Sequence, residues 1–356
     1  MWAMIVKEFR QLRRDRRTLA MMIVMPVILL VVFGYAASFD VSTIRTVAAG
    51  PQAAAFVHRL GSPFTLAASA PGQHRGWAEQ QLRDGKADAA VVTGAGRPAV
   101  LIDGSQLFTA RQAVASLAID ASRLAPGAGA GRPAAAAAPA VTVLYNPTLA
   151  TSDIMIPGLA GVVLVFIGTI ITSLGVVRER QTGTLEQLAV MPLRPRDVFL
   201  GKIAPYFGVA AADLAIVLAV GVALFGVPFR GSYAVFALGA VLFLFVTLGL
   251  GVLISSVSEN QGQAIQLSVM VMLPQVLLSG LVFPLASMAA GVRWISYILP
   301  LTYFNEISRG VMLRAEPIGP LWQPMVFLAL LGLVVVTVAT LRFRSYLAPA
   351  AGRGQQ

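Results

Sequence analysis

Six long stretches of this chain are almost free of charge. They cover residues 18–39, 154–177, 203–229, 231–258, 260–292 and 317–341, and Asp213 is the one charged residue inside them. Each stretch has at least 22 residues, and about 20 residues of helix cross the hydrocarbon core of a bilayer. Charged residues make up 12% of the chain, whereas soluble domains carry about 25%. The sequence therefore predicts an all-α polytopic membrane bundle with six transmembrane helices.

The side chains of common catalytic and metal sites are scarce. Cysteine is absent, and His58 and His74 are isolated from each other, which excludes disulfides, thiolate ligands and a His-Glu-x-x-His zinc motif. Gly85-Lys86 and Gly201-Lys202 lack the rest of a phosphate-binding loop. We therefore expect no catalytic residue, metal or cofactor on this chain.

Residues 40–153 have a different composition. Short apolar runs at 89–92 and 99–102 stand beside glycine and proline, which is typical of strands. Residues 77–84 and 109–124 have the pattern of amphipathic helices. Residues 125–140 are almost entirely alanine, proline and glycine, as in a flexible linker. The sequence predicts a small α/β domain, with this linker, inserted after the first transmembrane helix.

The distribution of Lys and Arg predicts the orientation. Residues 1–17 carry six basic side chains, 178–202 carry five, and the tail 342–356 carries three. Basic residues in short segments favour the cytoplasmic side. Both termini and the 178–202 loop are thus expected inside and the α/β domain outside, although Arg293, Arg309 and Arg314 then fall outside.

The N-terminus carries an amphipathic pattern before the first apolar stretch. Trp2, Ile5 and Phe9 share one helical face over residues 1–17, which indicates a helix lying in the lipid interface; a topology signal alone is the alternative. The stretch 18–39 is longer than the roughly 7–15 apolar residues of a cleaved signal peptide. We expect an uncleaved first transmembrane helix at 18–39.

The cytoplasmic loop contains a short helix signal. Thr184 and Gln187 fit a capping box, and Pro192 ends the pattern. Leu185 and Leu188 would share an apolar face, so the segment 182–192 is predicted to dock on a partner surface. A connecting helix packed on its own bundle is the alternative.

The stretch 260–292 is too long for one crossing. Pro274 and Pro284 interrupt it, and another apolar run, 294–304, follows Arg293. These features predict one transmembrane helix followed by a re-entrant segment, 284–305, that forms an outer gate, within a membrane unit running from 154 to 341. A plain long loop with interfacial aromatic residues is the alternative.

Asp213 lies near the centre of the third stretch. An ionisable group at that depth is costly and faces the bundle interior or a water-filled path. The sequence leaves three roles open, which are binding a cationic substrate, carrying protons and holding helices together.

Several short motifs stand out along the chain, and the most specific is the run from Arg178 to Leu188. The others are Asn146-Pro147, Ile156-Pro157-Gly158-Leu159, Pro205-Tyr206, Pro300-Leu301-Thr302-Tyr303 and Glu306-Ile307-Ser308-Arg309-Gly310. Together they resemble the ABC-2 type permeases of ABC exporters, and most closely the multidrug-efflux-like subgroup with a large extracytoplasmic domain. Gln181 stands where an acidic residue is common in this family.

The resemblance implies a non-enzymatic transporter subunit in a bacterial inner membrane. Such permeases pair as homodimers or heterodimers, contact membrane lipids, and dock two ABC ATPase subunits that hold the ATP and Mg; no nucleic acid is involved. The implied export substrate is hydrophobic or amphipathic, of a drug, lipid or glycan type. Alternatives are a mechanical transducer without solute flux and an ion-coupled carrier using Asp213.

The resemblance also implies roles for individual residues. An ATPase-coupling role falls on Arg178, Glu179, Arg180, Gly183, Thr184, Leu185, Glu186 and Leu188. A role in the outer gate falls on Pro284, Pro300, Tyr303, Glu306 and Arg309.

Overall fold

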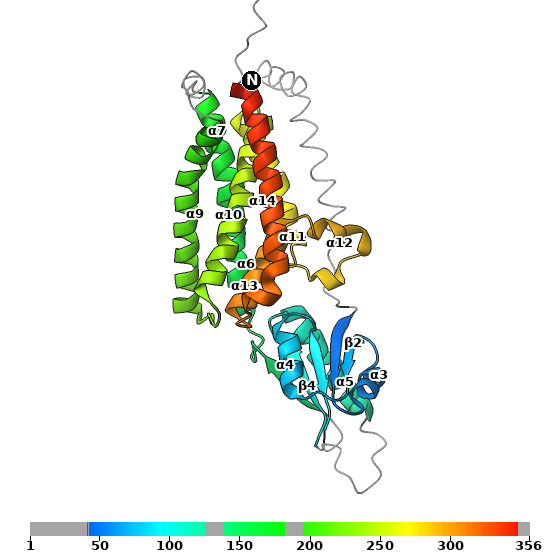
Figure 1. Cartoon of the computed structure of the whole chain (residues 1–356). Helices are drawn as coiled ribbons and strands as arrows, with labels where there is room; N and C mark the ends of the chain where they lie inside the picture. Colours follow the sequence, from blue (N-terminus) through cyan, green and yellow to red (C-terminus); the bar gives the residue numbers. More distant parts are fainter. Residues whose placement is uncertain (1–40, 42, 95, 125–138, 182–194, 348–356) are drawn as a thin grey trace, which may run out of the picture.

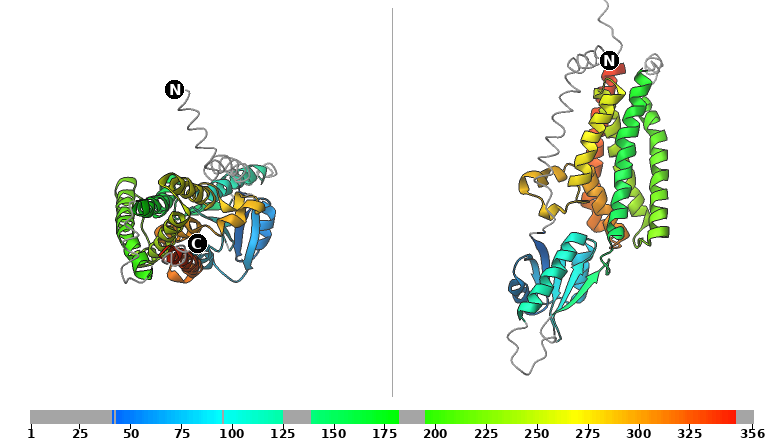
Figure 2. Two further views of the ribbon diagram at one scale, coloured as in Figure 1. Left: turned by 90° about the horizontal axis from the view of Figure 1, so that it is seen from above. Right: turned by 180° about the vertical axis from the view of Figure 1, so that it is seen from behind.

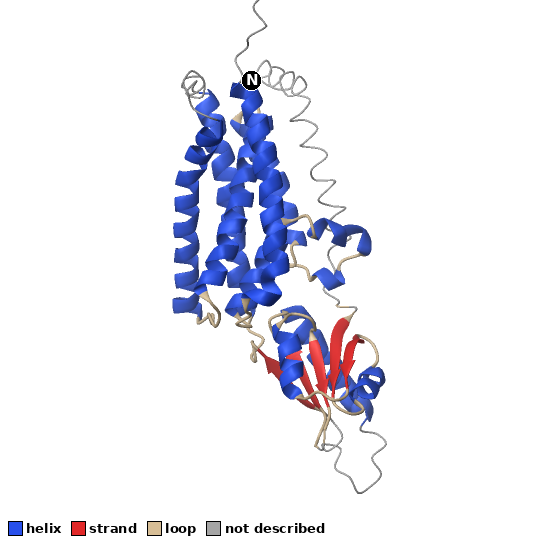
Figure 3. Ribbon diagram, viewed as in Figure 1, coloured by secondary structure: helices blue, strands red, loops and turns tan. Residues whose placement is uncertain are grey.

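The chain forms a helical bundle with a small mixed sheet at one end (Figures 1 and 3). A computed structural model describes residues 41, 43–94, 96–124, 139–181 and 195–347. The interfacial helix at 1–17 and the first predicted transmembrane helix lie outside the described residues.

The sheet has five strands in the order β2-β1-β3-β4-β5. β1 pairs in parallel with β2 and β3, β3 pairs with β4 in antiparallel fashion, and β4 pairs in parallel with β5. The strands are β1 (Ile44–Ala49), β2 (Phe64–Ala70), β3 (Ala89–Val92), β4 (Ala99–Asp103) and β5 (Ala140–Leu144).

Alternating side chains give the sheet two apolar faces. Ile44, Val91 and Ile102 lie in one core with α3 (Ala53–Leu60) and α5 (Leu107–Leu124). Val47, Ala90 and Leu101 lie in the other core with α4 (Arg75–Arg83). Neighbouring residues of a strand point to opposite faces, so these short apolar runs make a three-layer α/β domain, as expected.

One boundary of the predicted linker is wrong. Ala140 does not belong to it but begins β5, where it pairs with Ala99 of β4. The alternating Ala140–Leu144 sequence satisfies the free edge of β4, and this non-local pairing outweighs the local alanine-rich composition. The rest of the predicted linker, 125–138, lies outside the described residues.

Four helical segments of the described part are long and apolar enough to cross a membrane. One combines α6 (Thr151–Phe166), the π-helical turn η2 (Ile167–Ile171) and α7 (Thr172–Gln181). The others lie in α9 (Pro195–Phe225), α10 (Tyr233–Val257) and α14 (Ile318–Leu347). They coincide with four of the six predicted stretches, and the total of six crossings stays a prediction.

The stretch 260–292 does not form one long helix. α11 (Gln261–Leu278) ends at Ser279, and Gly280 has a φ of 79° that glycine tolerates best. The chain continues through the 3-10 turn η3 (Leu285–Ser287), α12 (Ala290–Ser296) and α13 (Pro300–Met312). In both side views α12 projects from the bundle near α11 (Figures 1 and 2), while a re-entrant path through a membrane remains a prediction.

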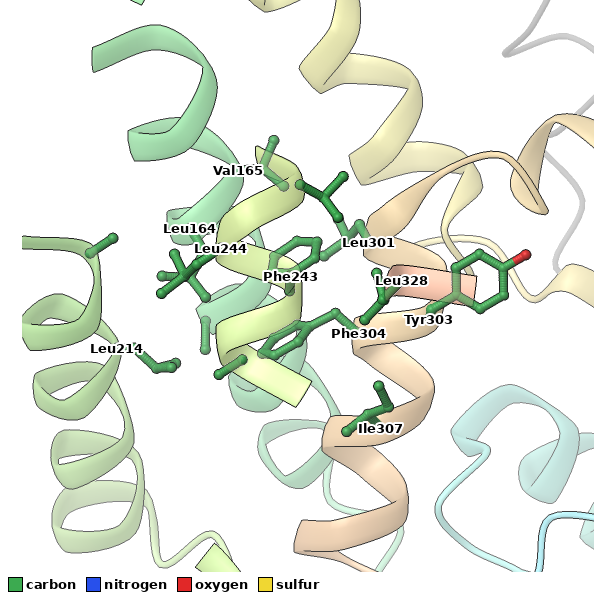
Figure 4. Close-up of a cluster of buried hydrophobic side chains, with 14 of the residues drawn as sticks. Leu164, Val165, Leu214, Phe243, Leu244, Leu301, Tyr303, Phe304, Ile307 and Leu328 are labelled. Carbon is green, nitrogen blue, oxygen red and sulfur yellow. The ribbon is translucent and has the colours of Figure 1, made fainter. Parts of the chain in front are cut away.

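The bundle core is built around stacked aromatic rings. The rings of Phe243 in α10 and Phe304 in α13 are parallel, with centroids 4.5 Å apart, and Leu164, Leu301 and Leu328 surround them (Figure 4). α10 packs against α14, α13 and α7. By contrast, the outer faces of α9 and α14 expose large apolar side chains such as Leu224 and Leu333, which suits contact with lipid or another protein.

The bundle has two distinct ends. The α/β domain lies at one, here called the domain end, and α7 ends and α9 begins at the other, here called the loop end (Figure 1). The domain is therefore separated by the length of the bundle from the end of α7, which the predicted coupling segment follows in the sequence.

Candidate functional site

A cavity of about 450 Å³ lies where the α/β domain meets the domain end of the bundle. The sheet side contributes residues of β1 and the ends of β3 and β4, and the bundle side contributes the α11–α12 connection and α13. Polar side chains that line it include Arg45, Asp88, Asp103, Arg293, Asn305, Glu306, Arg309 and Arg314.

Helix α13 presents three of these side chains in one turn. Pro300 at the first turn, where a missing N–H costs nothing, starts the helix. Asn305, Glu306 and Arg309 then follow at spacings of one, three and four residues, so Glu306 and Arg309 share a face. All three border the same cavity.

Two buried polar atoms of α13 have no partner among the described residues. Arg309 is 7% exposed; its Nη2 donates to the carbonyl oxygen of Gly280 at 3.1 Å, but its Nε lacks a hydrogen bond. Asn305 is 2% exposed; its Nδ2 donates to the Ser279 hydroxyl at 3.1 Å, but its Oδ1 lacks a partner. Buried polar atoms are normally satisfied, so this wall is prepared for a ligand or water.

The remaining charges of the cavity divide into paired and unpaired groups. Arg45 Nη2 binds Asp88 Oδ1 at 2.8 Å, and the Arg45 backbone N–H also donates to Asp88. Glu306 is exposed and Arg293 half-buried. Neither they nor Arg309 makes an ion pair within the described part of the chain.

A buried cluster around Arg314 joins the domain to the bundle. Arg314, just after α13, binds Glu316 at 2.6 Å, lies 3.7 Å from Asp103, and donates to the Ser105 hydroxyl at 3.1 Å. All three charged side chains are at most 4% exposed. Asp103 and Ser105 belong to the sheet side, so this cluster fixes the end of β4 against the α13–α14 connection.

Asp103 also stabilises the turn that directly follows β4. Its Oδ1 accepts the backbone N–H of Ser105 at 2.9 Å, and an added Cβ at Gly104 would collide with the carbonyl oxygen of Leu144. Burial raises the pKa of Asp103 above that of a free carboxyl. The positive charge of Arg314 opposes this rise, but Arg314 also pairs with Glu316.

The predicted gate residues occupy two different places. Pro284, Glu306 and Arg309 border the cavity. Tyr303 instead donates its hydroxyl hydrogen to the carbonyl oxygen of Tyr297 at 2.6 Å and stacks on Phe327 of α14, while Pro300 is the first residue of the helix. Asp103, Asn305 and Arg314 were not predicted as site residues from the sequence. The available signal was Arg314, a basic residue on the expected outer side.

At the loop end, part of the predicted coupling set is described. Arg178, Glu179 and Arg180 form the last turn of α7, and Arg180 donates to the carbonyl oxygens of Ser255 and Ser258. Gln181 accepts from Gln261 at 2.9 Å. The end of α7 is thus bound to the α10–α11 turn, whereas Gly183, Thr184, Leu185, Glu186 and Leu188 lie outside the described residues.

Polar contacts surround η2 in the middle of the bundle. The hydroxyls of Ser173 and Ser268 are 3.0 Å apart, and Ser268 donates to the Thr169 carbonyl oxygen at 3.2 Å. Gly251 of α10 lies against the carbonyl oxygen of Gly168. π-helical turns are rare and occur often at functional positions, so this segment is a candidate for movement.

Asp213 is half-buried on α9, beside the buried residue Leu214. No ion-pair partner for its carboxylate is found among the residues that the structure describes. Its three alternative roles therefore stay predictions.

Comparison with known proteins identifies the family. Residues 16–341 match the model of the ABC-2 family transporter protein. The chain belongs to the ABC-2 transporter family. The match includes both the α/β domain and the bundle.

Relatives from Escherichia coli have permease names. The chain is 31% identical over 338 residues to the probable multidrug ABC transporter permease YbhS of strain K12, covering 88% of each chain. It is 35% identical over 196 residues to the probable multidrug ABC transporter permease YbhR, covering 55% of this chain and 52% of that one. It is 32% identical over 183 residues to the inner membrane transport permease YhhJ, covering 51% and 49%.

Proposed function

We propose that this chain is the membrane subunit of an ATP-driven exporter that moves a hydrophobic or amphipathic molecule across a bacterial inner membrane. The observation that carries the proposal is the ABC-2 family match over residues 16–341, together with the permease names of the Escherichia coli relatives. ABC-2 permeases work with ABC ATPase subunits, so ATP and Mg would be held by separate chains.

The proposed coupling path begins at the loop end. ATP binding would close two partner ATPases against the segment 182–192 of two permease copies, and the end of α7 would carry that motion into the bundle. Arg180 supports this path because it ties α7 to the α10–α11 turn. The π-helical turn supports it as well, because α10 packs closely against its backbone at Gly168 and π-helical turns occur often at functional positions.

At the domain end, movement of α13 would alter the cavity. Glu306 and Arg309 lie on α13, and Arg45 and Asp88 lie on the opposing sheet. A change in their separation would change the affinity for cargo between the two states, which is what coupling by a ligand on another chain requires.

The test is ATP-dependent export by the permease reconstituted with its ATPase. Glu186→Arg or Leu188→Arg should abolish coupled transport while the bundle keeps its melting temperature, because both changes alter the docking segment alone. The exposed pair Arg75 and Glu79 offers a control, since Glu79→Arg changes charge in α4 of the α/β domain. Unchanged export in the docking variants would contradict the coupling path.

A mechanical transducer without solute flux is the second candidate. The buried Arg314 cluster favours it, because it ties the α/β domain to the bundle closely enough to transmit force. This candidate predicts ATPase coupling with no cargo movement in liposomes. An ion-coupled carrier would work without any ATPase and would lose activity in Asp213→Asn.

A further inference from the structure

The cavity at the domain end carries unpaired groups of both signs. Arg45 is paired with Asp88, and Arg314 with Glu316 and Asp103. Arg293, Arg309 and Glu306 face the same cavity without an ion pair in the described part of the chain. A ligand that enters the cavity would therefore meet two positively charged side chains and one negatively charged side chain that have no ion-pair partner in the described part of the chain.

Two buried atoms of α13 indicate how a ligand would be oriented in this cavity. Arg309 Nε is a donor without an acceptor, and Asn305 Oδ1 is an acceptor without a donor. Leaving such groups without a hydrogen bond is costly. A ligand that satisfies them would offer anionic oxygen atoms to Arg309 and Arg293, and an N–H donor to Asn305 and Glu306. A single zwitterionic head does both.

The cavity continues into an apolar surface. Arg293 and Tyr297 border it, and on the same short helix and its end Trp294, Tyr297 and Ile298 are each more than half exposed. Aromatic side chains with a polar edge are favoured where a bilayer meets water. The exposed face of α12 is therefore suited to a hydrocarbon chain whose head lies in the cavity.

We propose that this cavity binds an amphiphile with a zwitterionic head, its phosphate or carboxylate held by Arg309 and Arg293, its ammonium held by Glu306 and Asn305, and its tail lying along α12. The volume of about 450 Å³ is within the range of small-molecule sites. The proposal rests on the proposed export function, for which it names the chemical class of the cargo. A bilayer lipid and an amphipathic solute share this chemistry.

The experiment measures binding to the purified full-length chain in detergent, without ATPase or ATP. The main probe is a short-chain phosphatidylethanolamine with a fluorescent acyl group. The matched probes are phosphatidic acid, which lacks the ammonium, and diacylglycerol, which lacks both charges. α-Aminododecanoic acid serves as the soluble competitor.

The wild type should prefer phosphatidylethanolamine to diacylglycerol by at least about tenfold. Arg293→Gln and Arg309→Gln should remove most of this preference. Glu306→Gln should leave the affinity for phosphatidic acid intact but abolish the preference for the ammonium-bearing lipid. Arg75→Gln and Glu79→Gln, which remove the same charges from exposed α4, should bind like the wild type.

Because Arg309 also bonds to Gly280, Arg309→Gln alone could perturb folding. Arg293→Gln and Glu306→Gln remove the charge of side chains that make no such bond, so they test the proposal without this effect on folding. Competition by α-aminododecanoic acid below its aggregation concentration would support a soluble source; its failure beside tight lipid binding would support a lipid source.

Equal binding of the three lipids, or equal binding by the wild type and the cavity variants, would overturn the proposal. Trp294→Ala should weaken the lipid probes severalfold. If it instead dissociates a dimer and leaves lipid binding unchanged, α12 is an interface between copies and the tail assignment is wrong. Since no ATP is present, loss of ATP-driven export would not produce any of these results.

Discussion

Arg314 holds two buried carboxylates that belong to different parts of the chain. Removing one partner of a buried ion pair typically costs about 3–5 kcal/mol, because the remaining charge is left without compensation. We therefore expect Arg314→Gln to lower the free energy of unfolding by roughly that amount.

The measurement is thermal unfolding in detergent, combined with limited proteolysis at the junction between domain and bundle. Arg75→Gln is the matched control, because its pair with Glu79 is exposed and such pairs contribute less than about 1 kcal/mol. Equal melting of Arg314→Gln and wild type would show that the cluster does not hold the domain.

Asp103 gives the same junction a pH dependence. Because burial raises its pKa, the folded state binds more protons than the unfolded state, whose carboxyl has a pKa of about 3.9. The contribution of Asp103 to stability therefore falls as pH rises from about 4 toward the raised value.

Asp103→Asn should remove this part of the slope, because asparagine keeps an acceptor for the Ser105 N–H and does not titrate. The check is the melting temperature of both proteins in steps from about pH 4 upward, because the unfolded carboxyl has a pKa of about 3.9 and the native pKa is higher. Parallel curves would contradict the assignment.

At the scale of elements, the contact between η2 and α10 depends on the absence of side chains. A Cβ at Gly251 would overlap the carbonyl oxygen of Gly168, whereas a Cβ at Gly208 of α9 would meet nothing within 4 Å. Gly251→Ala should destabilise the protein by about 1–3 kcal/mol, as overpacking does. Gly208→Ala should be neutral or stabilising by up to about 1 kcal/mol; melting of the two variants distinguishes these outcomes.

Arg180, in the last turn of α7, is a residue of the proposed coupling path that the structure describes. Arg180→Gln should break its bonds to the α10–α11 turn and lower the substrate-stimulated ATPase rate of the complex severalfold, with basal ATPase unchanged. Arg180→Lys, which keeps the charge but cannot reach two carbonyl groups with one fork, should have an intermediate rate. A wild-type rate in both variants would contradict the path.

Long elements could be predicted from sequence and the junctions between them could not. Four apolar stretches became α6–α7, α9, α10 and α14 because length and hydropathy alone decide such helices. Ala140, the first residue of β5, was assigned to the linker because its partner in β4, Ala99, lies 41 residues earlier. Arg314 and Ser105 are 209 residues apart in sequence, and no local pattern indicates that they meet.

For the candidate site, the proline and charged residues of α13 drew attention to a helix that borders the cavity, but not to the sheet residues opposite it. Glu306 and Arg309 were expected at a gate, and both border the cavity. Arg45 and Asp88 were missed because a paired surface arginine in a small domain has no distinguishing sequence pattern. The cavity exists only through tertiary contact between two units with different compositions.

At the scale of the whole molecule, the topology can be tested with single thiols, because the chain contains no cysteine. Ser69→Cys on β2 and Gln181→Cys at the end of α7 are both exposed sites. In intact cells or inner-membrane vesicles of one orientation, we expect a membrane-impermeant maleimide to react with one of them and not with the other. From outside, Ser69→Cys should be labelled.

Labelling of both sites from the same side would contradict a bundle that separates the domain from the coupling segment. Labelling of Gln181→Cys from outside would reverse the expected orientation. Detergent-solubilised samples, in which both thiols should react, control for accessibility.

The ion pair between Asp103 and Arg314 connects the sheet to the bundle, so a force applied to the sheet would be transmitted to the bundle. A rigid binder that clamps the exposed edge strand β2 would restrain α13 from a distance, through β1, β3 and β4. Under the proposed function and orientation, an antibody fragment of this kind would slow export from the side of the membrane opposite to the ATPase subunits.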